Sequence, residues 1–118
     1  MNKEDMKRRT KHFALNIIPL VATLPYGRLT EVIGRQLLRS GTSVGSNYRS
    51  ACRAKSTTDF ISKMVVVEEE AHETIYWMEL FIESDLARQD DLTHLLDKAN
   101  QILAITVSSI KTARRNKK

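Results

Sequence analysis

Residues that break helices or cross-link chains are scarce in this sequence. Its 118 residues include four glycines, two prolines and a single cysteine, Cys52. An all-β domain needs turn residues about every 8–12 positions, so the composition argues against a β-sandwich or a small barrel. One thiol can form neither an internal disulfide nor a cysteine-based zinc site, which fits a reducing cytosol. We interpret Cys52 as a small residue packed between helices.

Long apolar runs are also lacking. No stretch approaches the roughly 18 consecutive apolar residues of a membrane-spanning helix. The apolar residues 14–24 follow a basic start, as they would in a signal peptide. However, Glu4 and Asp5 lie in that start, Pro19 interrupts the apolar stretch and no A-x-A cleavage site follows. We therefore expect a cytoplasmic protein without a membrane partner.

Four segments carry apolar residues at helical spacing, separated by three short breaks. They predict helices over about 4–24, 30–54, 56–84 and 90–113, followed by a frayed basic tail at 114–118. Ser56 and Asp59 fit a capping box at the start of the third helix. Short connections make consecutive helices antiparallel neighbours. We therefore predict a single domain over 1–118 that is all-α, an antiparallel up-down-up-down four-helix bundle.

The middle of the second segment, residues 40–47, is rich in glycine and serine and has low helix propensity. We predict that it is helical, because a stripe of small residues lets a neighbouring helix approach closely. A loop is the alternative. If helical, the stripe packs either within one bundle or between two.

Positive charge exceeds negative charge, with 19 Lys and Arg against 14 Asp and Glu, a net charge of +5. The predicted topology brings the start of the first helix, the second connection and the end of the fourth helix together. Only three acidic residues, Glu4, Asp5 and Asp59, fall there. We name this region the basic end, and its fourteen basic residues are Lys3, Lys7, Arg8, Arg9, Lys11, Arg49, Arg53, Lys55, Lys63, Lys111, Arg114, Arg115, Lys117 and Lys118.

A basic patch of this kind is the footprint of phosphate binding. The alternative is that these side chains only solubilise the helix ends and complement the dipole of the fourth helix. Phe13 and Tyr48 alone interleave with the patch, so structured RNA fits better than stacked single strands. The candidate nucleic-acid contacts are Lys7, Arg8, Arg9, Lys11, Arg49, Arg53, Lys55, Lys111, Arg114 and Arg115.

Constellations for catalysis or metal binding are not apparent. The E-x-x-H at Glu69–His72 and the D-x-x-H at Asp91–His94 would differ in height by roughly 12 Å along the bundle, too far to share a di-metal site. Ser40, Ser43 and Ser46 have no histidine partner nearby in the sequence. We expect no metal, no cofactor and no enzymatic activity.

Two further features concern packing. The run Glu68–Glu70 holds more carboxylates than one exposed face accommodates, so at least one should meet Arg35 or Arg39 on the second helix. A solvated acidic face is the alternative. Trp77 fills the bundle core, as the nearby Tyr76 and Phe81 favour, or anchors a subunit interface.

Three stretches together resemble a known family. Residues 35–49 read RQLLRSGTSVGSNYR, residues 56–63 read STTDFISK and residues 73–80 read ETIYWMEL. They resemble the signature of the bacterial four helix bundle proteins, also called 23S rRNA intervening-sequence proteins, over nearly the whole chain. The residues that match the motif are Arg39, Ser40, Ser43, Gly45, Asn47, Glu73 and Trp77.

This family is similar to the accessory variability determinant of diversity-generating retroelements, a basic pentameric ring of four-helix bundles that binds nucleic acid and a reverse transcriptase. The resemblance implies a homo-oligomer, expected to be a pentamer, with structured RNA or an RNA-associated protein as its partner. Our leading hypothesis is a non-enzymatic oligomeric bundle that binds structured RNA or other nucleic acid through the basic end. The alternative is an oligomeric protein-interaction scaffold without affinity for nucleic acid.

Overall fold

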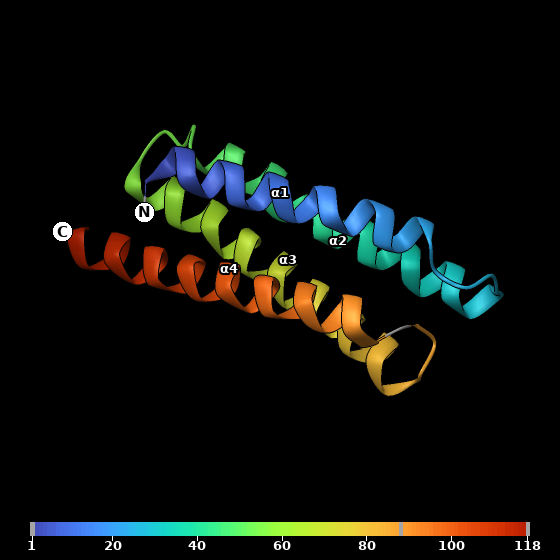
Figure 1. Cartoon of the computed structure of the whole chain (residues 1–118). Coiled ribbons are helices and arrows are strands. Elements are labelled where there is room, and N and C mark those ends of the chain that lie inside the picture. Colours follow the sequence, from blue (N-terminus) through green and yellow to red (C-terminus); the bar gives the residue numbers. More distant parts are fainter. Residues whose placement is uncertain (1, 88, 118) are drawn as a thin grey trace.

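The computed structural model describes residues 2–87 and 89–117, and it consists of four antiparallel helices (Figure 1). They are α1 (Lys3–Ala22), α2 (Arg28–Ala51), α3 (Thr57–Glu83) and α4 (Gln89–Asn116). The molecule is elongated, with principal extents of 51 × 20 × 19 Å. The predicted all-α four-helix bundle is confirmed. None of the helices in the described part is long and apolar enough to span a membrane.

The end of α4 differs from the prediction. The helix continues beyond residue 113 through Arg114 and Arg115 to Asn116, where a frayed tail was expected. Ile110 is buried and Ala113 is half-buried, so the last turns of α4 remain packed on the bundle. Two arginines in the last turn also complement the negative end of the helix dipole. Lys118 lies outside the described residues.

Side-chain caps define two of the helix starts. Asn2 and Asp5 form a reciprocal capping box at α1. At α3 the Ser56 hydroxyl accepts a hydrogen bond from the Asp59 amide at 3.0 Å, as predicted. The Asp59 carboxylate accepts from the Lys55 amide at 3.0 Å, one residue before the position that a capping box requires. The start of α3 is therefore fixed by the sequence that connects it to α2.

The small residues of α2 are helical, so the predicted helix is confirmed, and they face α1 within the same bundle. A Cβ added at Gly41 would lie 3.2 Å from Ile17 Cγ1, and one at Gly45 would lie 3.2 Å from Thr10 Oγ1. Ile17 and Thr10 are fully buried. The glycines therefore let α1 lie closer to α2 than alanine would allow.

The core runs the length of the bundle, with fully buried large side chains from all four helices such as Ile17, Leu37, Met64, Phe81 and Leu92. Adjacent helices pack unequally. The contact between α2 and α3 is the most extensive, and the contact between α1 and α4 is the least. This leaves an open seam along one side of the bundle.

Candidate nucleic-acid interface

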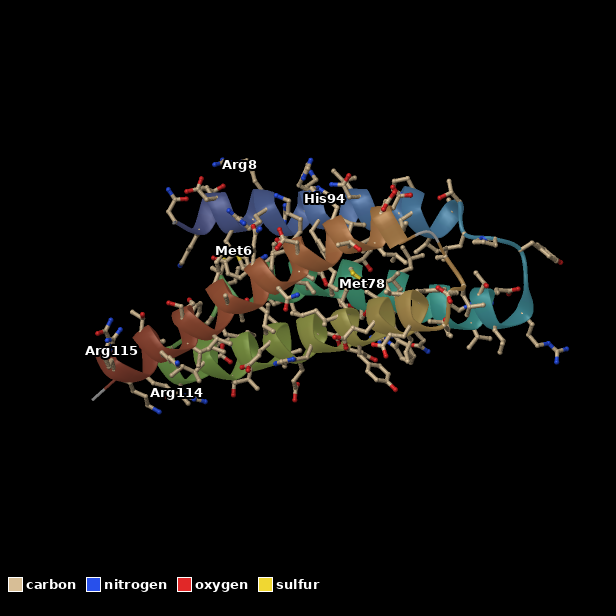
Figure 2. All side chains as sticks on the ribbon, turned by 60° about the horizontal axis from the view of Figure 1, so that its bottom comes forward. Met6, Arg8, Met78, His94, Arg114 and Arg115 are labelled. Carbon is tan, nitrogen blue, oxygen red and sulfur yellow. The ribbon has the colours of Figure 1, made fainter. Side chains whose placement is uncertain are left out.

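The basic end lies where the topology predicts. The N-terminus of α1, the connection from α2 to α3 and the C-terminus of α4 share one end of the molecule (Figure 1). Arg114 and Arg115 lie in the last turn of α4 and point away from the ribbon in Figure 2. Of the ten candidate contact residues, all are exposed except Lys7 and Arg9, which are half-buried.

The three acidic residues of the basic end are all engaged by neighbours on their own helices. Glu4 lies 3.4 Å from Lys7, Asp5 pairs with Arg8 and Asp59 lies 2.6 Å from Lys63. The hydrogen bond from Lys63 and the one from the Lys55 amide hold the pKa of Asp59 below its usual value. These carboxylates consequently neutralise only the lysines and the arginine beside them in sequence.

The remaining cations of the basic end have no carboxylate within 4 Å in residues 2–87 and 89–117. They come from three elements that meet at this end, namely α1, the α2–α3 junction and α4. The residues are Lys3, Arg9, Lys11, Arg49, Arg53, Lys55, Lys111, Arg114, Arg115 and Lys117. Their role as nucleic-acid contacts stays a prediction.

The two aromatic residues expected near this patch are not available for stacking. Phe13 is 3% exposed and Tyr48 is 6% exposed. Burial, together with a hydrogen bond to Cys52, raises the pKa of the Tyr48 hydroxyl. Cys52 itself is half-buried and packs against the core, as interpreted from the sequence.

Sequence reasoning missed a groove between α1 and α4. This α1–α4 groove has a volume of about 670 Å³ and a floor of the buried side chains Phe13, Leu95 and Ile102. Arg9 Nη1 crosses it to donate to Gln101 Oε1 at 3.0 Å. The polar side chains that line it are Asp5, Arg8, Arg9, Lys11, His12, Asn16, His94, Lys98 and Gln101.

Lys98 of α4 lines the same groove as Arg8 and Lys11 of α1. Its position near the middle of α4 places it beside the middle of the antiparallel α1. The antiparallel pairing of the first and fourth helices, already predicted, was the signal that could have revealed this. Figure 2 shows His94 on the part of α4 that lies beside α1.

A second groove opens at the basic end itself. It has a volume of about 830 Å³ and lies between the first turns of α1, at Lys3 and Met6, and the last part of α4, at Ile105 and Thr112. Because α4 diverges from α1 here, side chains of α2 and α3 also line this groove: Tyr48, Phe60 and Met64. Figure 2 shows the same divergence, with Met6 apart from Arg114 and Arg115.

The two serines and the asparagine of the family motif in α2 form side-chain hydrogen bonds to backbone carbonyls of their own helix. Ser40 Oγ donates to Gln36 O at 3.0 Å, Ser43 Oγ donates to Arg39 O at 2.6 Å, and Asn47 Nδ2 donates to Ser43 O at 2.8 Å. These short polar side chains therefore occupy little space beside the neighbouring helix, like Gly45. Their place in the fold is consistent with a packing role.

The predicted ion pair between α2 and α3 forms at Arg39 and does not form at Arg35. Arg39 lies 2.6 Å from Glu73 and 3.4 Å from Glu70, and its side chain is half-exposed. The pair with Glu73 raises the pKa of Arg39. Arg35 instead pairs with Glu31 on its own helix at 2.7 Å, because its side chain lies on the solvent side of α2.

Trp77 is half-buried and packs against the core from the outer side of α3. Its ring meets Tyr76 edge to face, with centroids 5.3 Å apart and planes at 65°. Tyr76 is 53% exposed. The buried indole Nε1 has no hydrogen-bond partner in the described part of the chain.

The histidines of the E-x-x-H and D-x-x-H stretches, which the sequence spacing places too far apart to share a di-metal site, are both exposed. His72 lies 3.9 Å from Glu68 on its own helix, and His94 lines the α1–α4 groove. Residues 2–87 and 89–117 contain no group of three or more His, Cys, Asp or Glu side chains that could hold a metal ion.

These features define a class, the elongated antiparallel four-helix bundles with one strongly basic end. The chain belongs to the 23S rRNA-intervening sequence protein family, which matches residues 2–108. This confirms the resemblance found in the sequence.

A solved structure from Bacteroides thetaiotaomicron VPI-5482, described as a protein with unknown function from the S23 ribosomal protein family, is similar to the chain. The two share 34% identity and a TM-score of 0.86, over 94% of this chain and 99% of that one. No curated protein matches the chain.

Proposed function

We propose that this protein is a non-enzymatic, homo-oligomeric bundle that binds structured RNA through its basic end in the bacterial cytoplasm. The observation that carries the proposal is the set of exposed cations at that end without carboxylate partners in the described chain. Each cation that neutralises a phosphate releases a condensed counterion, which favours binding most at low salt. Membership in the 23S rRNA-intervening sequence family is consistent with an RNA ligand.

The test is a salt titration of binding to a labelled RNA hairpin, with duplex DNA of equal length as the comparison. Each phosphate contact contributes about −0.9 to the slope of log affinity against log salt for duplex DNA. We expect a slope that corresponds to several contacts and a higher affinity for RNA. The double variant Arg114→Glu/Arg115→Glu should weaken binding strongly and flatten the slope, since two cations become anions.

A matched control is Arg28→Glu/Arg35→Glu at the other end of the bundle. Both arginines are exposed, as Arg114 and Arg115 are. Because each double variant replaces two arginines with glutamates, the two variants lower the net charge by the same amount. If both double variants weaken RNA binding equally, the effect reflects net charge and the basic end is not the site. Binding without salt dependence would contradict the proposal outright.

The alternative, a protein-interaction scaffold, is favoured by a different observation. Large apolar side chains are exposed near the connection from α1 to α2, at the end opposite the basic one: Tyr26 at 106%, Leu29 at 65% and Val32 at 56%. Such a patch suits contact with another protein. The double variant Leu29→Ser/Val32→Ser should break up the oligomer if the patch joins copies of this chain.

The oligomer itself is proposed to be a pentamer, by the family resemblance. Native mass spectrometry of the purified chain measures the subunit number directly, and a monomer at micromolar concentration would contradict this part of the proposal. If the oligomer forms and RNA does not bind, the scaffold becomes the better description.

A further inference from the structure

We propose that the α1–α4 groove binds an unpaired segment of RNA adjoining the duplex that the basic end holds. The inference rests on the proposed function and adds a second kind of contact to it. The two regions are continuous, because Arg8, Arg9 and Lys11 belong to the basic end and also line the groove.

The charge of the groove suits a phosphodiester backbone. Three basic side chains of α1 face Lys98 of α4 across it, and the one carboxylate in its lining, Asp5, is already paired with Arg8. No ion pair in residues 2–87 and 89–117 engages Lys11 or Lys98. The field in the groove is therefore positive, and an anionic strand is attracted along it.

The shape of the groove selects for a single strand. Its walls are two neighbouring helices of a bundle whose cross-section is only 20 × 19 Å. A groove between two helices of such a bundle is narrower than an A-form duplex, which could touch only the rims. A volume of about 670 Å³ falls within the range of small-molecule pockets, roughly 300–1,000 Å³, which suits splayed nucleotides.

The groove also offers flat rings for unstacked bases. His12 on α1 and His94 on α4 are exposed and line it, and histidine is among the side chains on which RNA bases stack. The Asn16 amide nitrogen lies 3.3 Å from His12 Nδ1 and also donates to His12 O at 2.9 Å.

Arg9 is held in place by hydrogen bonds where the basic end meets the α1–α4 groove. It donates to Gln101 Oε1 at 3.0 Å, and Gln101 in turn donates to Asp97 at 2.9 Å. This chain of hydrogen bonds fixes a half-buried guanidinium where the strand would leave the basic end and enter the groove. A positioned guanidinium loses little side-chain entropy when a phosphate binds.

The experiment compares two labelled hairpins with the same stem, one blunt and one with a short single-stranded overhang, by fluorescence anisotropy at fixed salt. We expect the overhang to strengthen binding about tenfold, the effect of stacking roughly one base. His94→Ala should remove most of that preference and leave the affinity for the blunt hairpin unchanged. His12→Ala should do the same from the opposite wall.

The chain supplies a matched control, because its third histidine, His72, is exposed on α3 and outside the groove. His72→Ala should leave both affinities unchanged. If the two hairpins bind with equal affinity and binding still depends on salt, the proposal for the groove is wrong. The proposal that the basic end binds RNA is then unaffected. An overhang preference that survives both His12→Ala and His94→Ala also overturns the proposal for the groove. If neither hairpin binds, the proposed function fails first.

Discussion

The close approach of α1 to α2 leads to a test in which two glycine-to-alanine changes have opposite effects. A Cβ at Gly34 would lie 3.2 Å from Leu24 Cδ1, the mobile end of a half-buried side chain. A Cβ at Gly45 would lie 3.2 Å from Thr10 Oγ1, 3.3 Å from Thr10 Cβ and 3.5 Å from the Thr10 carbonyl carbon. The added Cβ would thus lie equally close to its nearest neighbour at both sites. The two neighbours, Leu24 and Thr10, differ in how easily they can move away.

Whether the neighbouring side chain can move away decides whether the alanine stabilises or destabilises the fold. Alanine in place of glycine stabilises a helix interior by about 0.8–1 kcal/mol. Leu24 can rotate its terminal methyl away, so Gly34→Ala should keep most of that gain. Thr10 is fully buried and its hydroxyl donates to Met6 O at 2.9 Å, so it cannot move without loss of that bond or a shift of α1.

Overpacking of a well-packed interface costs about 1–3 kcal/mol. Set against the gain in helix propensity, Gly45→Ala should lower the free energy of unfolding by roughly 1 kcal/mol. Gly34→Ala should raise it by up to about 1 kcal/mol. The free energies of unfolding of the two variants should therefore differ by up to about 2 kcal/mol.

The assay is urea unfolding, followed by far-ultraviolet circular dichroism and by the fluorescence of Trp77, the single tryptophan. All variants are compared at one protein concentration, because an oligomer gains stability with concentration. A Gly45→Ala variant as stable as Gly34→Ala would refute the close packing of α1 on α2. An unchanged m-value shows that the difference lies in stability and not in the extent of unfolding.

Three other predictions concern polar contacts. Ser56→Ala removes the cap of α3 and should cost about 1 kcal/mol by urea unfolding, while Ser56→Asp should retain the stability. The pKa of Asp59 is lowered chiefly by Lys63, so its stabilising charge is present above the unfolded pKa of about 3.9 and is lost as pH falls through that region. Asp59→Asn should therefore lower the Tm at pH near 7, and the difference should shrink as the pH of the melts falls below the unfolded pKa of about 3.9. A double-mutant cycle on Arg39 and Glu73 should give a coupling of about 0.2–1 kcal/mol that shrinks in roughly 1 M salt, and a coupling insensitive to salt would contradict the half-exposed pair.

The helices and their order were predictable from the chain because the signals for them are local. Apolar residues such as Phe13 and Ile17 recur at helical spacing, and Ser56 begins α3 through a hydrogen bond to a residue three positions away. Short connections then require antiparallel neighbours. The basic end followed from that order alone, since charges at the starts and ends of known helices must gather at known ends.

Other features depended on how the helices turn toward one another, which no local pattern specifies. Residues 40–47 have low helix propensity and are nevertheless helical, because Gly41 and Gly45 allow α1 to pack closely against them. The sequence did not specify which helix would pack against these small residues. Arg35 and Arg39 lie one turn apart, and only Arg39 faces α3.

The α1–α4 groove is the clearest case of a feature decided by packing between distant parts of the chain. Arg9 and Gln101 are separated by 92 positions and meet at 3.0 Å because α1 and α4 are antiparallel and only loosely packed. Composition and periodicity identify each helix by its buried stripe. They carry no information on how wide a gap two exposed faces leave, because that gap is set by the packing of all four helices together.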